Sequence, residues 1–99
     1  MKLQEKGRQL RIFIDEDNTY KGKLLYEAIV LKARELHLAG ATVSRGIMGY
    51  GADSRISTAK ILRLSSHLPV VIDIVDSEEN IEKIMPFLDE VVDKGLVTL

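Results

Sequence analysis

The sequence predicts an α+β fold in which two helices cover one face of a four-stranded antiparallel sheet. Apolar and polar residues alternate near the N-terminus, which is typical of a half-buried strand, and two later segments repeat apolar residues at helical spacing. The segments follow the order strand, helix, strand, strand, helix, strand, which describes two βαβ halves. We therefore expect a ferredoxin-like βαββαβ sandwich with the sheet order 4-1-3-2, as a single domain over residues 1–99.

The first half of the chain is predicted to form a strand, a loop, a helix and a second strand. In the strand Gln9–Asp15, the residues Leu10, Ile12 and Ile14 share one face, and Arg11 and Phe13 share the other. Residues 15–22 form a polar loop. A helix is expected over residues 23–39, with Gly40 as the glycine that closes it. Residues 41–49 form the second strand.

The second half is predicted to contain a long excursion, a strand, a helix and a short last strand. Residues 50–68 are polar and irregular, and loops of this length inside compact domains are often functional. Residues 69–76 form the most apolar strand. The following helix is expected to be capped by Ser77 and to end at Gly95. A kink is expected at Pro86, which lacks a backbone donor.

The sheet face that points away from the helices is predicted to be partly apolar. It carries Phe13, Met48, Val71 and Val75. Arg11 and Asp73, on neighbouring central strands, point to the same face and could form an ion pair there, depending on the register of the two strands. Contiguous apolar surface is unfavourable in water, so burial against other copies of the chain is expected. The alternative is a partly solvated antiparallel face, which is common.

Composition excludes several classes of function. The chain contains no cysteine, which excludes disulfides, thiolate metal sites and cysteine nucleophiles. A net charge of −1 argues against general binding to nucleic acid or to anionic membranes. The polar N-terminus does not fit a signal peptide, and no apolar run approaches the roughly 20 residues that span a bilayer. A cytoplasmic protein without membrane insertion is therefore expected.

The best candidate for a binding site is the glycine-rich end of the second predicted strand, with the polar residues that follow it. The candidate ligand-binding residues are Arg45, Gly46, Gly49, Tyr50, Gly51, Arg55 and Lys60. Glycines at a strand end let backbone N–H groups approach a ligand closely, and the basic side chains favour an anion. The alternative is a bulge and a turn without a ligand, because a Gly-x-Gly pattern alone is a weak signal.

Candidates for catalysis are few, and no enzymatic activity is expected. His37 lies near the end of the first predicted helix, where a cation suits the helix dipole. His67 lies in the loop before Pro69, next to two serines whose spacing alone does not make a triad. The carboxylates of residues 15–17 are expected to face solvent, with weak binding of a hard cation as the alternative. Two distant histidines without cysteine do not give the usual spacing of zinc ligands.

Several segments of the chain together resemble the DUF190 family, also called UPF0166. The resemblance rests on Lys21–Ile29, Ala39–Ile47, Gly49–Gly51, Ile61–Ser65, Leu68–Val71 and Gly95–Val97, and it covers nearly the whole chain from Leu10 onward. This family is related to the PII nitrogen-regulatory proteins. The resemblance therefore implies a homotrimer of ferredoxin-like subunits, with a long loop after the second strand.

The wider resemblance to PII proteins also implies a function. In PII proteins a nucleotide lies in the cleft between subunits, against a Gly-aromatic-Gly turn, and the following loop contacts partner proteins. Gly49–Gly51 matches that turn, whereas the phosphate-gripping segment is reduced to Lys94-Gly95. The resemblance implies a trimeric sensor that binds a small anionic effector, with an adenine nucleotide as one candidate, and that meets a transporter or an enzyme through residues 52–68. The alternatives are an oligomeric interaction module without a ligand and a divalent-cation binder at the trimer interface.

Overall fold

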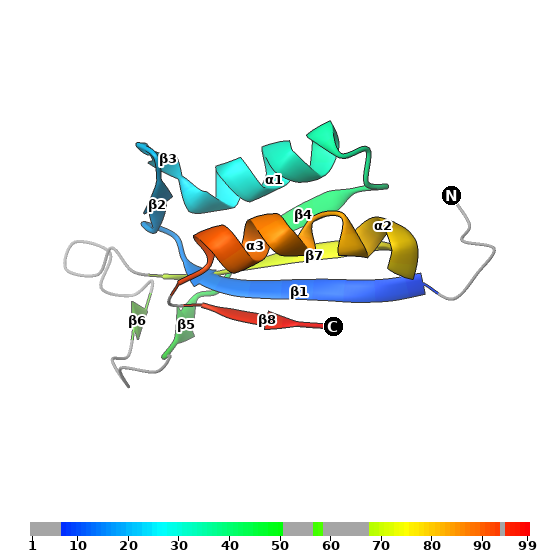
Figure 1. The fold of residues 1–99 in the computed structure, drawn as a ribbon. Helices are drawn as coiled ribbons and strands as arrows, with labels where there is room; N and C mark the ends of the chain where they lie inside the picture. Colours follow the sequence, from blue (N-terminus) through cyan, green and yellow to red (C-terminus); the bar gives the residue numbers. More distant parts are fainter. Residues whose placement is uncertain (1–6, 51–56, 59–67, 94) are drawn as a thin grey trace.

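The computed structural model describes residues 7–50, 57–58, 68–93 and 95–99. Its helices pack over one face of a four-stranded antiparallel sheet, which confirms the predicted α+β architecture (Figure 1). In chain order the elements are β1 (Gly7–Asp15), β2 (Thr19–Tyr20), β3 (Lys23–Leu24), α1 (Leu25–Glu35), β4 (Ala41–Arg45), β5 (Met48–Gly49), β6 (Ser57–Thr58), β7 (Pro69–Ser77), α2 (Glu78–Glu82), α3 (Met85–Val91) and β8 (Leu96–Thr98). Within these ranges, no helix is long and apolar enough to cross a membrane.

The sheet has the strand order β4-β7-β1-β8, and each neighbouring pair of strands is antiparallel. The long strands β1 and β7 lie at the centre. They pair along their whole length, from Gly7 opposite Ser77 to Asp15 opposite Pro69. The shorter strands β4 and β8 form the two edges. The central position of β7 places the end of β1 and the end of β4 on either side of its first residues.

Alternation along the two central strands separates the core from the open face, as predicted. The buried residues are Leu10, Ile12 and Ile14 of β1 and Val70, Ile72 and Ile74 of β7, which pack in one core with apolar residues of the helices. Arg11 and Asp73 lie opposite each other on the other face. Arg11 Nε donates a hydrogen bond to Asp73 Oδ1 at 2.7 Å, so the expected ion pair is present.

The predicted helix end at Gly40 is wrong, because the left-handed residue that closes α1 is His37, with φ at 62°. His37 N donates to Arg34 O and Leu38 N donates to Ala33 O, both at 3.0 Å. These two bonds define a Schellman motif, in which a hydrophobic contact usually accompanies the backbone bonds. Leu38 and Ala33 are both buried, so the motif docks the helix end onto the core.

The second predicted helix consists of two helices, α2 and α3, with Lys83 and Ile84 between them. Pro86 lies in the first turn of α3, where a residue without a backbone donor is well accommodated. The prediction of one kinked helix is therefore wrong, since the proline begins a new helix. The predicted cap is confirmed: the hydroxyl of Ser77 accepts a hydrogen bond from Asn80 N at 3.3 Å.

A buried carboxylate that sequence reasoning missed connects the segment after α1 to the start of α2. Asp76 is only 4% exposed. It accepts hydrogen bonds from Ala39 N at 2.8 Å, Ser77 N at 2.7 Å and Asn80 Nδ2 at 3.1 Å. Burial raises the pKa of Asp76, but these hydrogen bonds outweigh burial and leave the pKa below its ordinary value. The ionised carboxylate of Asp76 therefore links the segment after α1 to the start of α2.

The β2–β3 hairpin lies where the sequence predicts only a polar loop. Its two-residue turn is Lys21-Gly22, and both residues have positive φ, at 51° and 79°. Turns of this kind match the right-handed twist of paired strands, and glycine is the residue best suited to the second position. The hairpin ends directly at α1, so it fixes the entry to that helix.

The β5–β6 hairpin corrects the predicted second strand. The sheet strand β4 ends at Arg45, whereas residues 41–49 were expected to be continuous. Met48 and Gly49 form β5, which pairs with β6 outside the four-stranded sheet. The expected position of Met48 on the open sheet face is therefore wrong.

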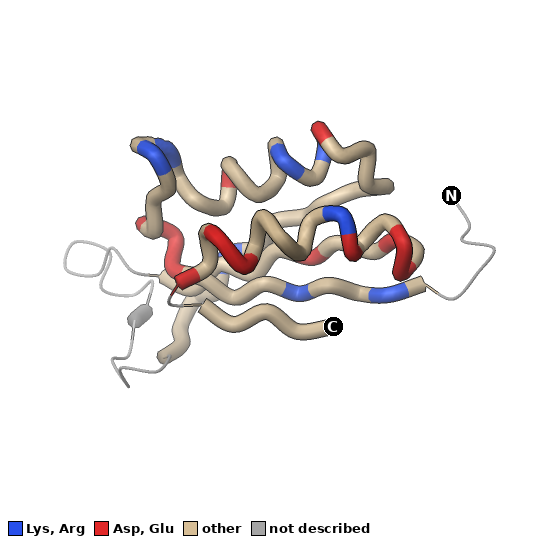
Figure 2. Tube along the Cα trace, viewed as in Figure 1, with Lys and Arg blue, Asp and Glu red and all other residues tan. Residues whose placement is uncertain are grey.

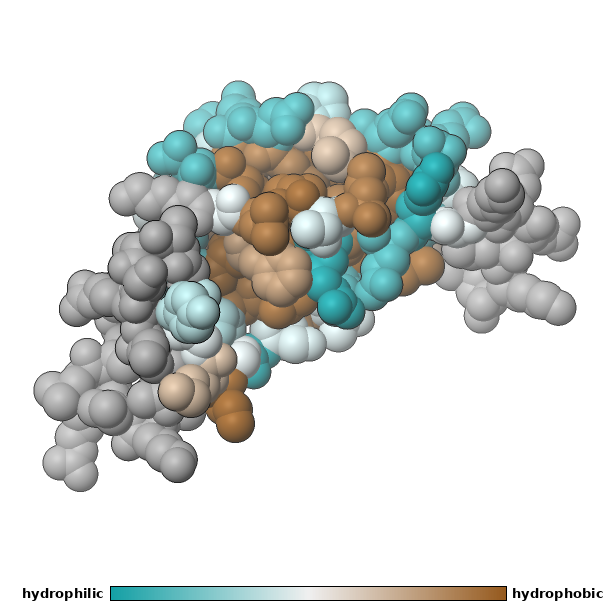
Figure 3. Space-filling view, turned by 90° about the horizontal axis from the view of Figure 1, so that it is seen from below, coloured by the Kyte–Doolittle hydropathy of each residue, from teal (hydrophilic) through white to brown (hydrophobic). Residues whose placement is uncertain are grey.

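The open face of the sheet carries a row of apolar side chains in the single chain. Leu96, Phe13 and Val71 are register partners on β8, β1 and β7, so they cross three strands side by side. Leu96 is 58% exposed, Phe13 36% and Val75 48%. Figure 3 looks at the molecule from below and shows hydrophobic residues gathered across the middle of the view, bordered by hydrophilic ones. The predicted apolar patch is present, without Met48.

Candidate functional site

Three segments of the chain meet at one end of the sheet. Here β1 leads into Glu16, β4 leads into Gly46, and β7 begins at Pro69. Glu16 N donates to Leu68 O at 2.9 Å, and Gly46 N donates to Pro69 O at 2.7 Å. Backbone hydrogen bonds therefore hold the residues after β1 and β4 against the start of β7. The predicted binding segment begins at this junction.

Arg45 and Glu16 form a two-point ion pair across the junction. Arg45 Nε donates to Glu16 Oε2 at 2.5 Å, and Arg45 Nη2 donates to Glu16 Oε1 at 2.8 Å. The hydrogen bond to Glu16, followed by the charge of Glu16, raises the pKa of Arg45, so the guanidinium remains cationic. The Arg45 side chain is 58% exposed, against 23% for Glu16. The cation that was predicted to attract an anion thus holds a carboxylate of its own chain, within reach of solvent.

Gly46 and Gly49 pack closely against Pro69. A Cβ atom at Gly46 would lie 2.8 Å from Pro69 Cγ, and one at Gly49 would lie 3.2 Å from the same atom. The backbone N–H of Gly46 is also engaged by the Pro69 carbonyl. The close approach of Pro69 to the backbone is thus sufficient to explain why both positions are glycine.

Large apolar side chains beside Gly49 are strongly exposed. Ile47 is 77% exposed, Met48 61% and Tyr50 73%. Neighbouring apolar residues with this exposure favour contact with another molecule. The ring of Tyr50 is suited to stacking on a planar ligand or to packing on a protein surface.

Part of the predicted site lies outside the described residues. The site residues outside the described ranges are Gly51, Arg55 and Lys60. His67, which was considered separately, also lies outside them, within residues 59–67. Of the predicted partner-binding segment 52–68, the structure describes the backbone of β6 and the buried Leu68. The structure brings Arg45, Gly46 and Gly49 to the junction, and Tyr50 follows Gly49 directly.

Glu16 and Pro69 shape this junction although sequence reasoning did not select them. Glu16 was expected to face solvent, and the only local signal was its position directly after a strand. Pro69 was expected to begin a strand, but the two glycines that it contacts are some twenty residues away along the chain. The sheet order, which places β7 between β1 and β4, brings all these residues together.

The described part of the chain does not assemble a metal site. Within it, no three histidine, aspartate or glutamate residues form a group that could hold a metal ion. His37 is exposed and serves as the closing residue of α1. Its position is therefore explained by backbone geometry alone.

The chain is similar in sequence to one known protein family and to individual proteins of two organisms. The chain matches the profile of DUF190, described as an uncharacterized ACR, over residues 7–99. It is 45% identical over 96 residues to a UPF0166 protein of Aquifex aeolicus, a match that covers 95% of this chain and 89% of that protein. It is 39% identical over 95 residues to a UPF0166 protein of Methanocaldococcus jannaschii, with 95% and 87% covered.

Proposed function

The chain belongs to the DUF190 family, and on that premise we propose that it is a PII-like sensor. In this proposal, three ferredoxin-like subunits assemble through their open sheet faces, bind a small anionic effector between them and signal through the segment after β4. The ferredoxin-like assignment is supported by the sheet order, because β8, β1, β7 and β4 are the fourth, first, third and second of the sheet strands along the chain. The relatives are named only as UPF0166 proteins, so the support comes from geometry.

Support for assembly comes from the open sheet face. Leu96, Phe13 and Val71 form an apolar row across three strands, and solvent reaches it in the single chain. Burial of such a row contributes about 25 cal/mol for each Å² of apolar surface removed from water, from which the entropic cost of association is deducted. The Arg11–Asp73 pair beside the row would be desolvated as a satisfied pair, which costs less than burial of a lone charge.

Support for an anionic effector comes from the Arg45–Glu16 ion pair, the single observation that carries this proposal. A guanidinium offers two parallel donors that fit a carboxylate or a phosphate equally well. The Glu16 carboxylate occupies that fork in the free protein, at 2.5 and 2.8 Å. An effector phosphate or carboxylate would take the same position, and the exposed ring of Tyr50, next to Gly49 in the sequence, would be available to stack on a base.

Replacement of Glu16 by the effector at the Arg45 guanidinium would also transmit the signal. Arg45 is the last residue of β4, so it directly precedes the segment that leads into β5. Release of Glu16 would remove a link between that segment and the end of β1. An effector shifts such an equilibrium only if it favours one state over the other, and competition for the guanidinium supplies that difference.

Isothermal titration of the assembled protein with AMP, ADP, ATP and cyclic AMP tests the effector site. Arg45→Gln should weaken binding of the active nucleotide by about tenfold or more, because a charge-assisted contact is lost. Glu16→Gln should tighten binding, because the internal competitor is gone. Arg8→Gln, at an exposed cation outside the junction, is the matched control and should leave affinity unchanged. No heat with any of the four nucleotides would remove the nucleotide form of the proposal.

A ligand-free interaction module is the second candidate, and one observation favours it. The N–H of Gly46 is engaged and both glycines pack on Pro69, so the junction is explained without an effector. Gly49→Ala separates the two candidates. A folded oligomer that loses effector binding supports the sensor, whereas loss of assembly without any ligand phenotype supports the module.

A further inference from the structure

Charge is unevenly distributed over the helical layer. Figure 2 shows that acidic residues predominate along α2 and α3, that the β2–β3 hairpin carries basic residues, and that α1 carries both signs. The net charge of the chain is only −1, so this uneven distribution is a property of the surface and not of the composition. A surface that concentrates one sign of charge attracts partners of the opposite sign.

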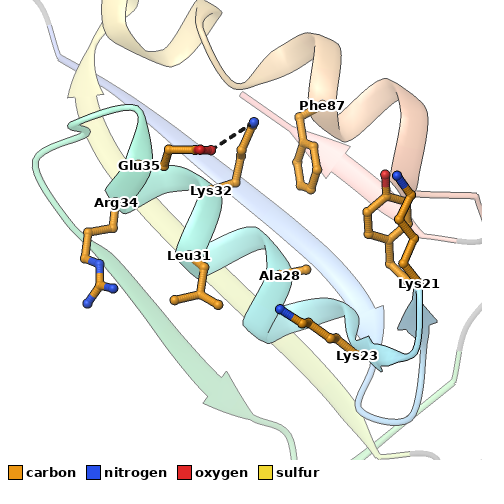
Figure 4. A pocket seen from close by; sticks show the side chains of 9 residues that line it. Lys21, Lys23, Ala28, Leu31, Lys32, Arg34, Glu35 and Phe87 are labelled. Atoms are coloured by element: carbon orange, nitrogen blue, oxygen red, sulfur yellow. Dashed lines mark ion pairs between the residues drawn. The ribbon is translucent and has the colours of Figure 1, made fainter.

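The basic side of the layer is hollowed. A shallow depression of about 500 Å³ lies over the outer surface of α1, beside the hairpin and Phe87 of α3 (Figure 4). Its cationic lining residues are Lys21, Lys23, Lys32 and Arg34, against the single carboxylate of Glu35. Apolar groups lie among these cations, among them Phe87 and Leu31, which is 46% exposed.

Two of the cations lie near aromatic rings, and one of them, Lys32, also forms an ion pair with Glu35 at 3.0 Å. Lys21 Nζ lies 5.3 Å from the centre of the Tyr20 ring, and Lys32 Nζ lies 5.4 Å from the centre of the Phe87 ring. The two rings meet edge to face at 5.8 Å, and Tyr20 OH donates to Glu90 Oε2 at 3.0 Å. These contacts restrain side chains along one wall of the depression, so less side-chain entropy is lost when a partner binds.

We propose that this depression, the α1 hollow, docks an acidic segment of a partner protein. The cations are spread from the hairpin to the last turn of α1, a helix about 16 Å long. A single phosphate would reach only part of that distance, whereas a peptide with spaced carboxylates matches the whole of it. Leu31 and Phe87 offer apolar contact between the charges, as in the centre of a protein interface.

A second copy of this chain fits the α1 hollow less well. The acidic surface on α2 and α3 could meet it only head to tail, and such contacts lead to open filaments unless they close into a ring. The hollow is also in the helical layer, away from the open sheet face that the proposed assembly would bury. Docking at the α1 hollow and assembly through the open sheet face can therefore be tested independently.

Fluorescence anisotropy with a labelled peptide that combines glutamate and leucine residues tests the proposal on the full chain. The Lys23→Glu/Arg34→Glu variant should bind this peptide at least about tenfold more weakly than the wild type, because two attractive contacts become repulsive. The Arg8→Glu/Lys83→Glu variant has the same net charge with both changes outside the hollow, and it should bind like the wild type. Binding should also weaken as salt is added.

Three results would overturn the proposal. The first is absence of binding by the acidic peptide, or equal loss of binding in both double variants. The second is binding of inorganic phosphate or ADP, but not of the peptide, that disappears only in the hollow variant, since the site would then serve a small anion. The third is a wild-type protein whose mass in solution rises with its concentration, together with a smaller mass for the hollow variant but not for the Arg8→Glu/Lys83→Glu variant. The occupant of the hollow would then be a second copy of the chain.

Discussion

At the residue scale, the two glycines of the junction differ in how much space Pro69 leaves them. The gap of 2.8 Å at Gly46 is too short for any real Cβ contact, whereas 3.2 Å at Gly49 needs a shift of only a few tenths of an ångström. The ring of Pro69 is held within β7, so it has little freedom to move away. Gly46 is thus the more constrained position.

Gly46→Ala should therefore lower the free energy of unfolding by about 1–3 kcal/mol, the usual cost of overpacking. Gly49→Ala should cost less than about 1 kcal/mol by the same reasoning. Urea unfolding followed by circular dichroism measures both. Equal losses at the two positions would contradict the close contact at Gly46.

The buried carboxylate of Asp76 is expected to contribute to the stability of the fold. Asp76→Asn should lower the free energy of unfolding near pH 7 by about 2 kcal/mol, because a charged acceptor of three hydrogen bonds becomes an amide. The folded pKa is lowered, so the wild-type carboxylate stabilises the fold above its ordinary pKa of 3.8. That contribution is lost as the pH falls through the folded pKa.

The difference between wild type and Asp76→Asn should therefore narrow as the pH falls below about 4. Denaturant unfolding in a series of buffers from neutral to strongly acidic pH follows this difference. A gap that stays constant across the series would show that the carboxylate is not the stabilising group.

At the element scale, the end of α1 is stabilised by a motif whose key residue is not the usual one. His37 has φ at 62°, a conformation that costs a residue with a side chain roughly 1–2 kcal/mol and costs glycine far less. The backbone bonds of the Schellman motif do not involve the imidazole. The side chain at this position is therefore a cost to stability.

His37→Gly should raise the free energy of unfolding by about 1 kcal/mol, after the greater freedom of glycine in the unfolded chain is deducted. His37→Val should lower it, because a β-branched side chain is strained at positive φ. Thermal unfolding of the three proteins at one pH gives the order. A more stable valine variant would contradict the assigned backbone conformation.

At the scale of the whole molecule, some features follow from the sequence and others need the assembled sheet. A period of two along β1 and β7 predicts the buried residues and places Arg11 and Asp73 on the same face, because alternation fixes the faces of each strand. Their pairing also needs the register of the two strands, which only the assembled sheet supplies. The end of α1 does not follow from local pattern, since the helix closes at His37 in a motif that depends on burial of Leu38 in the core. The Arg45–Glu16 pair does not follow either, because it joins the end of β4 to the residue after β1, and β7 lies between these two strands.

Substitution on the open sheet face tests assembly at this scale. Phe13→Lys places a charge in the apolar row and should dissociate the oligomer, while the exposed position lets the monomer fold. Leu31→Lys is the matched control, since Leu31 is 46% exposed but lies on α1 in the helical layer. The control should keep the wild-type mass.

Light scattering coupled to gel filtration, at micromolar protein concentration, tests the central claim most directly. The proposed PII-like trimer, assembled through the row of Leu96, Phe13 and Val71, predicts a wild-type mass of three chains, and a mass of one chain for Phe13→Lys. A wild-type protein that elutes with the mass of a single 99-residue chain would contradict the account, because no cleft between subunits would then exist.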